Sequence, residues 1–376
     1  MSTPPASPPR PPSLSRARRR LLLSGAASLV APAVFAAKPH HGAATARSAR
    51  GATPVDDAAP DAFTYGSRAD VVRFADRLAE TRGWERDWVR ETLGLARFQP
   101  SVVRFIMPPV AGTAKNWAAY RARFVEPVRI RAGAAFWRAN DSWLAKAEAE
   151  HGVPPEVVVG ILGIESIWGR QMGDYRILDA LATLSFDFPR GRRDRSAFFQ
   201  EELEAWCALC RQDGIAPTAW RGSYAGAFGM AQFMPSSYLK HAVDFDGDGR
   251  IDLHRSAADA IGSVARYLAA FGWERGRPAT FEIAPPVETS ARATLLGPDI
   301  LPTFTAERIV ELGAALGDAA RAHPGPLALV ELQNGDAAPS YVAGTGNFYA
   351  VTRYNWSSYY AMAVLDLGAA VKRAVG

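Results

Sequence analysis

The 376-residue sequence contains only two cysteines, and this scarcity excludes a fold held together by a disulfide framework. Cys207 and Cys210 form a C-x-x-C motif without a second pair or a suitably spaced histidine, so they do not predict a zinc site. They lie in a strongly helical segment, where one helical turn does not readily give a disulfide its preferred geometry. We interpret them as thiols packed in a core, with a disulfide as the alternative in an oxidising compartment.

The sequence also lacks an excess of one charge once its N-terminus is set aside. Lysine and arginine number 43 and aspartate and glutamate 38, a formal net charge of +5. Five of the arginines and none of the acidic residues lie in residues 1–37, so the remainder is close to neutral. Proteins that bind nucleic acid normally carry a basic surface. The charge balance therefore argues against nucleic acid as a partner.

No hydrophobic run near the N-terminus is suited to a transmembrane helix. Residues 21–37 (LLLSGAASLVAPAVFAA) are too few and too rich in alanine, glycine and serine. Because Leu23-Ser24-Gly25 is followed by Ala26 and not by cysteine, a lipoprotein box is also absent. We expect neither a transmembrane nor a lipid anchor.

The same segment predicts export. Arginines followed by an apolar stretch and a cleavage site of small residues indicate a signal peptide over residues 1–37, cleaved after Ala36. A cleaved signal peptide predicts a periplasmic protein. Arg18-Arg19-Arg20 resembles a twin-arginine motif, although arginines equally form an ordinary n-region. Residues 38–60, which are small, polar and rich in proline and glycine, predict a disordered linker.

The rest of the chain has the composition of a soluble globular protein, with 48% hydrophobic and 22% charged residues overall. Apolar residues recur at three- and four-residue spacing over residues 61–151, which predicts helices. No repeat period indicates a solenoid. Residues 277–346 change character, with proline-rich breaks, short β-like runs (ATFEI, LALVEL and SYVAG) and one helical pattern, AERIVELGAALG.

The most informative stretch runs from Val153 to Gly173 (VPPEVVVGILGIESIWGRQMG). Its prolines suit a first helical turn, and the residues after them are apolar almost all round, as in a helix inside a domain. Glycines at 160 and 163 allow another backbone to approach closely. Glu165 is the one ionisable residue in the middle of this stretch, and its helical neighbours form an apolar frame around it. Desolvation in this frame favours the protonated form of its carboxyl group, as a general acid requires. The alternative is a half-buried carboxylate paired with Arg170.

Polar residues elsewhere suit a ligand-binding surface. Ser223 and Gln232 lie in a glycine-rich run (RGSYAGAFGMAQFMPSSYLKHA), and each is equally compatible with a satisfied polar group in a core. Arg190 opens a basic loop that suits anionic substrate groups or a solvated surface. The C-terminal segment, with Tyr354, Asn355 and Tyr360, combines aromatic and polar groups as sugar sites do, or forms a packing edge.

The segment Asp244 to Gly249 (DFDGDG) resembles the first half of an EF-hand loop. A carboxylate is absent at the twelfth position, which is Arg255, so a longer loop is needed to close a calcium site. The alternative is a solvated acidic turn. The predicted ligands are the carboxylates and one backbone carbonyl of Asp244, Asp246, Asp248, Arg250 and Asp259.

Taken together, these segments resemble the B-type lytic murein transglycosylases over roughly residues 60–376. The resemblance is carried, in order, by GILGIESIWGRQMG, RILDALATLSFDFP, GSYAGAFGMAQFMPSSYLKHAVDFDGDGRIDL, DAIGSVARYLAAFGW and NFYAVTRYNWSSYYAMAV. It implies a mainly α protein with a lysozyme-like helical catalytic core, an N-terminal helical lobe and a small inserted β-containing lobe. The implied ranges are 1–37 signal peptide, 38–60 linker, 61–151 N-terminal lobe, 152–276 core, 277–346 β-containing lobe and 347–376 a segment returning to the core.

The resemblance also implies the activity, which is cleavage of the MurNAc–GlcNAc β-1,4 bond of peptidoglycan without water. Glu165 is the implied single catalytic acid and base, no cofactor is needed for the chemistry, and the acidic loop matches a structural calcium site. The partner is the peptidoglycan glycan strand, and we expect a monomer that resembles the soluble relatives of a lipid-anchored founding type. The residues implied to line the glycan cleft are Ser223, Gln232, Tyr354, Asn355, Tyr360, Tyr120 and Arg190.

Two alternatives remain open from the residues alone. A hydrolase of the muramidase type needs a second carboxylate, for which Asp174 or Asp187 are the candidates. A non-catalytic scaffold that binds the cell wall would keep the fold without the chemistry. Against it stands Glu165 in its apolar frame.

Overall fold

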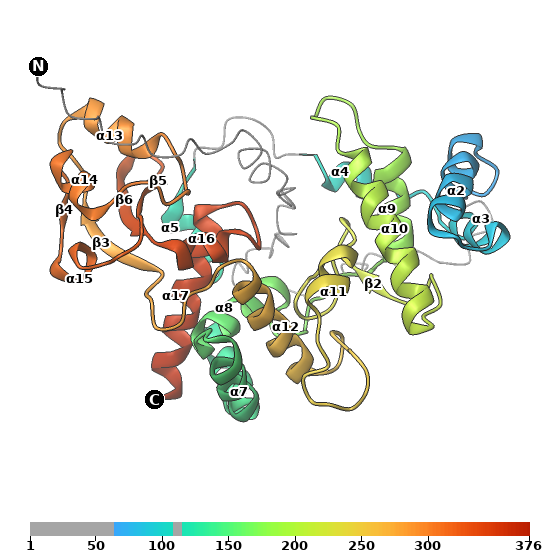
Figure 1. Cartoon of the computed structure of the whole chain (residues 1–376), viewed down its shortest axis with the longest axis horizontal. Coiled ribbons are helices and arrows are strands. Elements are labelled where there is room, and N and C mark those ends of the chain that lie inside the picture. Colours follow the sequence, from blue (N-terminus) through green and yellow to red (C-terminus); the bar gives the residue numbers. More distant parts are fainter. Residues whose placement is uncertain (1–63, 108–114) are drawn as a thin grey trace, which may run out of the picture.

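The apolar stretch around Glu165 forms helix α8 (Pro155–Ser166), which lies near the middle of the molecule within one of two groups of helices (Figure 1). The computed structural model describes residues 64–107 and 115–376. The predicted signal peptide and linker lie outside the described residues. Helices make up most of the regular structure, which confirms the mainly α fold. Among the described residues, no helix combines the length and apolarity that crossing a membrane requires.

One group of helices surrounds α8. The closest partner is the last helix, α17 (Ser358–Val375), because glycines on both helices remove the side chains between them. A Cβ on Gly160 would lie 2.3 Å from the backbone oxygen of Val364, and one on Gly368 would lie 2.0 Å from that of Glu156. The predicted close approach at Gly160 is therefore confirmed. The other helices of this group are α5 (Trp117–Ala122), α6 (Pro127–Ala139), α7 (Asp141–His151), α12 (Ala257–Ala270), α16 (Gly346–Thr352) and α17 (Ser358–Val375).

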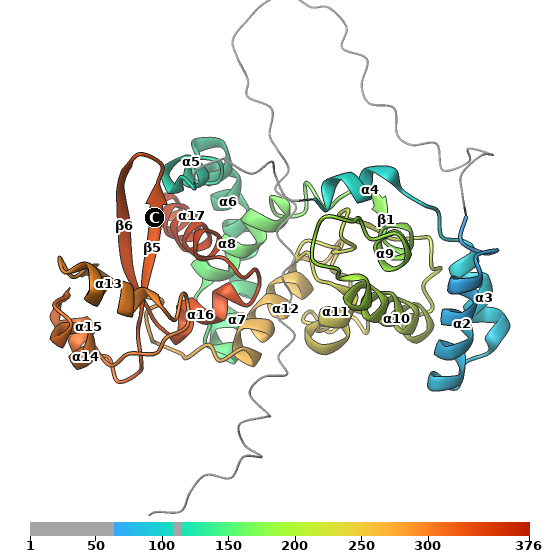
Figure 2. The ribbon, with the colours of Figure 1, turned by 90° about the horizontal axis from the view of Figure 1, so that it is seen from above.

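A second group of helices forms the other end of the molecule (Figures 1 and 2). Two of its members, α9 and α10, pack on each other. Buried Cys207 and Cys210 lie on α10 as unbonded core thiols. Burial raises the pKa of the Cys207 thiol to about 12, so this thiol stays protonated. The group consists of α2 (Ala69–Arg82), α3 (Arg86–Gly94), α4 (Pro100–Phe105), α9 (Ile177–Phe186), α10 (Ser196–Asp213) and α11 (Pro235–His241), with the short antiparallel strands β1 (Tyr175–Arg176) and β2 (Arg221–Gly222).

The range 61–151, which was predicted to form one N-terminal lobe, thus contributes helices to both ends. Helices α2 to α4 pack on the α9–α10 side, whereas α5 to α7 pack beside α8, α12 and α17. The domain boundaries themselves stay a prediction.

A small lobe with its own core is inserted between α12 and α16. Its antiparallel sheet has the order β4-β3-β6-β5, and its core is built from residues such as Leu295, Ile309 and Leu329. The predicted helix AERIVELGAALG is wrong beyond Glu311, because Gly313 takes a φ of 87° and the chain then forms an edge strand. The elements are β3 (Thr280–Ala284), α13 (Thr289–Leu296), α14 (Ala306–Glu311), β4 (Ala315–Leu316), α15 (Asp318–Arg321), β5 (Ala328–Asn334) and β6 (Ala337–Gly344).

Candidate active site

Glu165 lies in the last turn of α8, with its side chain half-buried. Burial raises the pKa of its carboxyl group to about 7, and a hydrogen bond from Tyr360 acts in the opposite direction. The Tyr360 hydroxyl donates to Oε1 of Glu165 over 2.5 Å. No ion pair joins the carboxyl group to Arg170 or to any other described cation, so the pairing alternative is wrong. The carboxyl group is therefore much more readily protonated near neutral pH than an exposed glutamate.

The chain turns sharply directly after Glu165. Ile167, Trp168 and Gly169 all have positive φ angles of 52°, 52° and 86°, which is unusual for a β-branched residue such as isoleucine. The turn sends the Trp168 ring back under the helix, where its Nε1 donates to the Val159 oxygen over 3.1 Å. Because the helix stops here, the Glu165 side chain lies on an open end of α8 instead of inside a continuing helix.

Two polar side chains hold this helix end in place. Arg129 on α6 donates from Nη1 to the backbone oxygen of Gly163 over 2.8 Å. Ser166 donates from Oγ to the oxygen of Met230 over 2.7 Å. The second contact ties the catalytic end of α8 to the glycine-rich loop, so the two segments keep a common geometry.

Four tyrosines from three helices and a loop surround Glu165. Besides Tyr360 on α17 they are Tyr120 on α5, Tyr267 on α12 and Tyr354, whose hydroxyl donates to the Ala231 oxygen over 2.8 Å. Burial, and then the nearby charge of Glu165, raise the pKa of Tyr120 to about 12, and the pKa of Tyr354 and Tyr360 lies well above the ordinary value. All four phenols therefore remain hydrogen-bond donors at neutral pH.

The glycine-rich loop brings Ser223 and Gln232 to the same region. Buried Ser223 closes a tight turn, since its Oγ accepts from the Ala227 amide over 3.1 Å. Gln232 has a φ of 48°, and its Nε2 donates to the oxygens of Met172 and Gly229 over 3.0 and 2.9 Å. These contacts fix the amide so that Oε1 faces no donor among the described residues. That oxygen can accept a hydrogen bond from a ligand.

The remaining predicted site residues differ in placement. Asn355 is 5% exposed, and its side-chain amide forms no hydrogen bond with a described residue. Arg190 is exposed beside a hollow of about 440 Å³ that also contains Phe188 and Arg192. No contact among the described residues joins Arg190 to Glu165. Tyr267 was missed by the sequence analysis, since a buried aromatic residue on an amphipathic helix looks like ordinary core.

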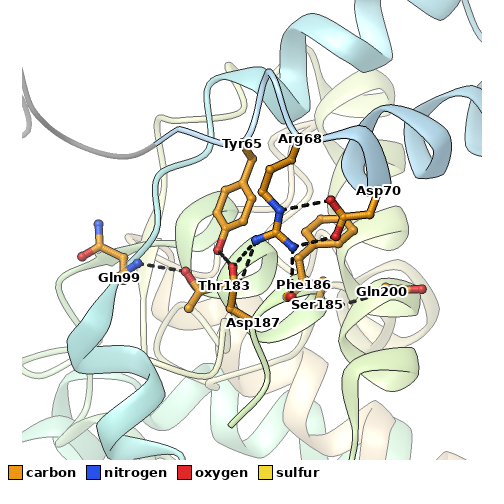
Figure 3. A network of polar contacts seen from close by, with 9 residues as sticks. All are labelled: Tyr65, Arg68, Asp70, Gln99, Thr183, Ser185, Phe186, Asp187 and Gln200. Carbon is orange, nitrogen blue, oxygen red and sulfur yellow. Dashed lines mark hydrogen bonds and ion pairs between the residues drawn. The ribbon is translucent and has the colours of Figure 1, made fainter.

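The two candidates for a second catalytic carboxylate do not resemble Glu165. Asp187 accepts hydrogen bonds from Tyr65 over 2.6 Å and from Arg68 over 2.7 and 2.8 Å (Figure 3). Its oxygens are occupied in fastening the N-terminal segment to the end of α9. Asp174 is exposed, unlike half-buried Glu165. Neither carboxylate is presented as a catalytic base.

The acidic loop gathers some of its predicted ligands. Oxygens of Asp244, Asp246 and Asp259 lie within 4.8 Å of one another. This spacing suits an oxygen-bound calcium ion, whose ligands lie at 2.3–2.6 Å. Buried Asp259 also accepts from the amides of Phe245 and Asp252, both over 2.8 Å. Asp248 lies outside this group of carboxylates and accepts from the Arg250 amide over 2.8 Å.

Comparison with known proteins identifies relatives over most of the chain. A family model described as the transglycosylase SLT domain matches residues 66–369. The membrane-bound lytic murein transglycosylase B of Escherichia coli (strain K12) is 38% identical over 317 residues, covering 82% of this chain and 84% of that protein.

Solved structures agree with these sequence matches. The E. coli lytic transglycosylase SLT35 in complex with calcium is 38% identical, with a TM-score of 0.69, and the match covers 82% of this chain and 94% of that one. SltB3 from Pseudomonas aeruginosa in complex with NAG-NAM-pentapeptide is 28% identical, with a TM-score of 0.66, over 80% of this chain and 79% of that one. The range that the family model matches, residues 66–369, includes both groups of helices and the inserted lobe.

Proposed function

The chain belongs to the transglycosylase SLT domain family and is a peptidoglycan lytic transglycosylase, and from this premise we propose that Glu165 is its general acid and then its general base. The comparisons confirm the predicted family, the lysozyme-like mainly α fold and the activity. The assignment of Glu165 is supported by its raised pKa of about 7 at an open helix end, ringed by tyrosines. That observation carries the proposal.

In the first step, protonated Glu165 gives its proton to the glycosidic oxygen between MurNAc and GlcNAc. The bond from C1 of MurNAc to that oxygen breaks, and GlcNAc leaves with a new hydroxyl group. A carboxyl group with a pKa near 7 is suited to this step, because enough of it is protonated at neutral pH. The Tyr360 hydrogen bond stabilises the carboxylate that forms.

In the second step, the Glu165 carboxylate takes the proton of the C6 hydroxyl of the same MurNAc. The C6 oxygen bonds to C1 and closes a 1,6-anhydro ring, so water is not consumed. An ordinary glycosidase needs a second carboxyl group for its water or nucleophile. Here the nucleophile is part of the substrate and gains the advantage of an intramolecular reaction. The single carboxyl group returns to its protonated form and is ready for the next turnover.

The polar groups around Glu165 are proposed to hold the glycan. Gln232 uses its amide nitrogen for two hydrogen bonds and leaves Oε1 without a described donor, which suits an N-acetyl N–H. Asn355 offers an unpaired amide, and the tyrosine rings offer faces for sugar stacking. The proposed substrate-binding residues are Ser223, Gln232, Tyr354, Asn355, Tyr360, Tyr120 and, for anionic groups of the strand, Arg190.

The decisive experiment is digestion of purified sacculi with product masses. We expect 1,6-anhydro ends from the native chain, and no cleavage from Glu165→Gln although it still binds glycan. Reducing ends would instead show a hydrolase that uses a second carboxylate. If the native chain fails to clear sacculi, it is a wall-binding scaffold. Turnover retained by Glu165→Gln would exclude the proposed mechanism.

We further propose that the acidic loop binds a structural calcium ion. Clustered carboxylates of Asp244, Asp246 and Asp259 support this, as does the calcium complex of the E. coli relative SLT35. The loop precedes α12, and Ser256 at the start of that helix donates to Asp246 over 2.8 Å. A bound ion would therefore fasten the helix that carries Tyr267, without taking part in the chemistry.

Export to the periplasm, through a signal peptide over residues 1–37, is the proposed location, because peptidoglycan lies there. Mass spectrometry of the mature N-terminus tests cleavage after Ala36, and export in a strain without the twin-arginine translocase tests the route. The proposed monomer is tested by light scattering. An uncleaved N-terminus, or a lipid-modified one, would contradict this location and processing.

A further inference from the structure

A recess lies between the inserted lobe and the loop that leads into α17. One part, of about 240 Å³, is lined by Tyr120, Trp356 and Tyr359 together with Lys115 and Asp299. A second part, of about 210 Å³, shares Lys115, Asp299 and Tyr359 and continues along β5. The recess is therefore bounded by aromatic rings on one side and carries charges of both signs.

Of the three charged side chains that line the recess, Glu331 accepts hydrogen bonds from Gln333 and Tyr341, whereas Lys115 and Asp299 are available for a ligand. Lys115 and Asp299 are both exposed, and neither forms an ion pair or a side-chain hydrogen bond with a described residue. Their side-chain charges therefore lie more than 4 Å apart in the same recess, where a ligand with both charges can reach both. Asp299 also takes a φ of 56°, a strained backbone for a residue other than glycine.

The backbone around the recess is firmly held. The Lys115 oxygen accepts from the Gly335 amide over 3.0 Å, at the turn between β5 and β6. The Tyr359 hydroxyl donates to the Gln333 oxygen over 2.9 Å. Lys115 and Tyr359 are thus attached to the same hairpin, so the recess does not depend on a mobile segment.

The recess opens beside the catalytic centre. Tyr120, which lines it, is close enough to Glu165 for the carboxylate charge to raise its pKa. The rings of Tyr120 and Tyr359 lie 5.8 Å apart, and the residue after Tyr359 is the one that donates to Glu165. A sugar at the catalytic centre would therefore have a side branch within reach of Lys115 and Asp299.

We propose that this recess binds the peptide branch of the glycan strand through an amino acid that carries a free carboxylate and a free ammonium group. Lys115 takes the carboxylate and Asp299 the ammonium. The inference rests on the proposed function, since only a peptidoglycan strand brings such a branch to Glu165. Each part of the recess is smaller than the 300–1,000 Å³ of a typical small-molecule site. That size suits a branch of a larger ligand better than a free ligand.

The test compares strands that carry their peptides with the same strands stripped by an amidase. The measured quantity is the ratio of kcat/KM on the two substrates, from the release of anhydro ends. An exposed charge pair is worth up to about fivefold, so Lys115→Met and Asp299→Asn should each lower the ratio about two- to fivefold. The exposed residues Lys240 and Asp318 supply matched controls, and Lys240→Met and Asp318→Asn should leave the ratio as it is.

A binding measurement covers the case in which the variants fold poorly. The Glu165→Gln chain is titrated with disaccharide-peptide fragments released from sacculi, in which the peptide keeps its amide link to the sugar, and with the same fragments acetylated at the free amine of the branch. Acetylation should weaken binding about two- to fivefold, and the difference should shrink at about 1 M salt, where charges are screened within about 3 Å. Equal binding of both fragments, or an unchanged kcat/KM ratio in both variants, overturns the proposal. If the native chain cleaves both strand types but the two variants leave the kcat/KM ratio unchanged, only the proposal for the recess is rejected. If the native chain cleaves neither strand type, the proposed function is rejected.

Discussion

Glu165 and Tyr360 lie 195 positions apart in the chain and are joined by one hydrogen bond between half-buried and buried groups. The bond stabilises the carboxylate, whereas burial stabilises the neutral acid, and the outcome is a pKa of about 7. The tyrosine thus adjusts how readily the acid gives its proton. This balance is a property of individual side chains and leads to predictions at the same scale.

Removal of the Tyr360 hydroxyl should shift the pH dependence of the reaction. The protonated form of Glu165 starts the reaction, so kcat/KM of the native chain should fall as the pH rises through about 7. Tyr360→Phe removes a bond that favours the carboxylate, so the pKa rises and the falling limb moves to higher pH. Because hydrogen bonds to charged groups are worth about 1.5–3 kcal/mol, the maximal rate should also drop at least about tenfold. A limb that stays in place or moves to lower pH would contradict this role.

The raised pKa of Glu165 should also make the stability of the folded protein depend on pH. The folded pKa of Glu165 lies above its ordinary value of 4.5, so the native protein loses stability as the pH rises from about 4.5 to about 7. Glu165→Gln carries no charge and escapes that loss. Thermal unfolding should therefore show a gain in Tm for Glu165→Gln that is small at pH 4.5 and reaches a plateau above pH 7. A gain independent of pH would mean that the carboxyl group is not desolvated.

Asp187 should prove structural. Asp187→Asn weakens its contacts to Tyr65 and Arg68, which fasten the N-terminal segment to α9 (Figure 3). We expect a loss of about 1–3 kcal/mol in the free energy of unfolding, measured with urea, because partly buried partners lose a charged acceptor. The release of anhydro ends below the unfolding temperature should persist. Loss of turnover in a fully folded Asp187→Asn variant would restore the two-carboxylate alternative.

At the scale of elements, the crossing of α8 and α17 decides whether the site exists. Glu165 lies at the end of one helix and Tyr360 in the first turns of the other, so their bond depends on the separation of the two backbones. Glycines on both helices allow the close packing. The turn at Ile167–Gly169 then ends α8 before Glu165 can be covered by a further helical turn.

A methyl group at this crossing should therefore impair both stability and activity. The Cβ of Gly160→Ala would lie 2.3 Å from the Val364 oxygen, so the helices must move apart. Overpacking of this kind costs about 1–3 kcal/mol, and kcat should fall because the Glu165–Tyr360 distance grows. The control is Gly317→Ala, where nothing lies within 4 Å of the new Cβ. Wild-type kinetics in folded Gly160→Ala would show that the crossing does not position the acid.

The acidic loop gives the second prediction for an element. Calcium should raise Tm, because an ion that binds only the folded state adds about 2.7 kcal/mol at a hundredfold excess over its Kd. Asp259→Asn should abolish most of that rise, since Asp259 belongs to the carboxylate cluster. The exposed Asp336→Asn serves as the control. If the Tm of the native chain does not change with calcium, the proposed calcium site is rejected and the loop is a solvated acidic turn.

At the scale of the whole molecule, the residues that meet at the site come from helices that lie far apart in the sequence. Tyr120 comes from α5, Glu165 from α8, Tyr267 from α12 and Tyr360 from α17, and the inserted lobe lies between the last two. The same arrangement places Lys115 and Asp299 in one recess. The lobe therefore contributes to the surface beside the catalytic centre as well as to its own core.

The mainly α fold, the buried helix around Glu165 and its desolvated acid followed from the sequence alone, because apolar periodicity and neighbours on one helix are local properties. The family resemblance added Tyr120 as a candidate. Only the tertiary structure revealed Tyr267 at the site, separated Arg190 from Glu165, fastened Asp187 to Tyr65 and Arg68, and distributed the N-terminal helices over two ends. These features depend on which distant segments pack together, and packing is set by the summed contacts of the whole chain rather than by any one stretch of it.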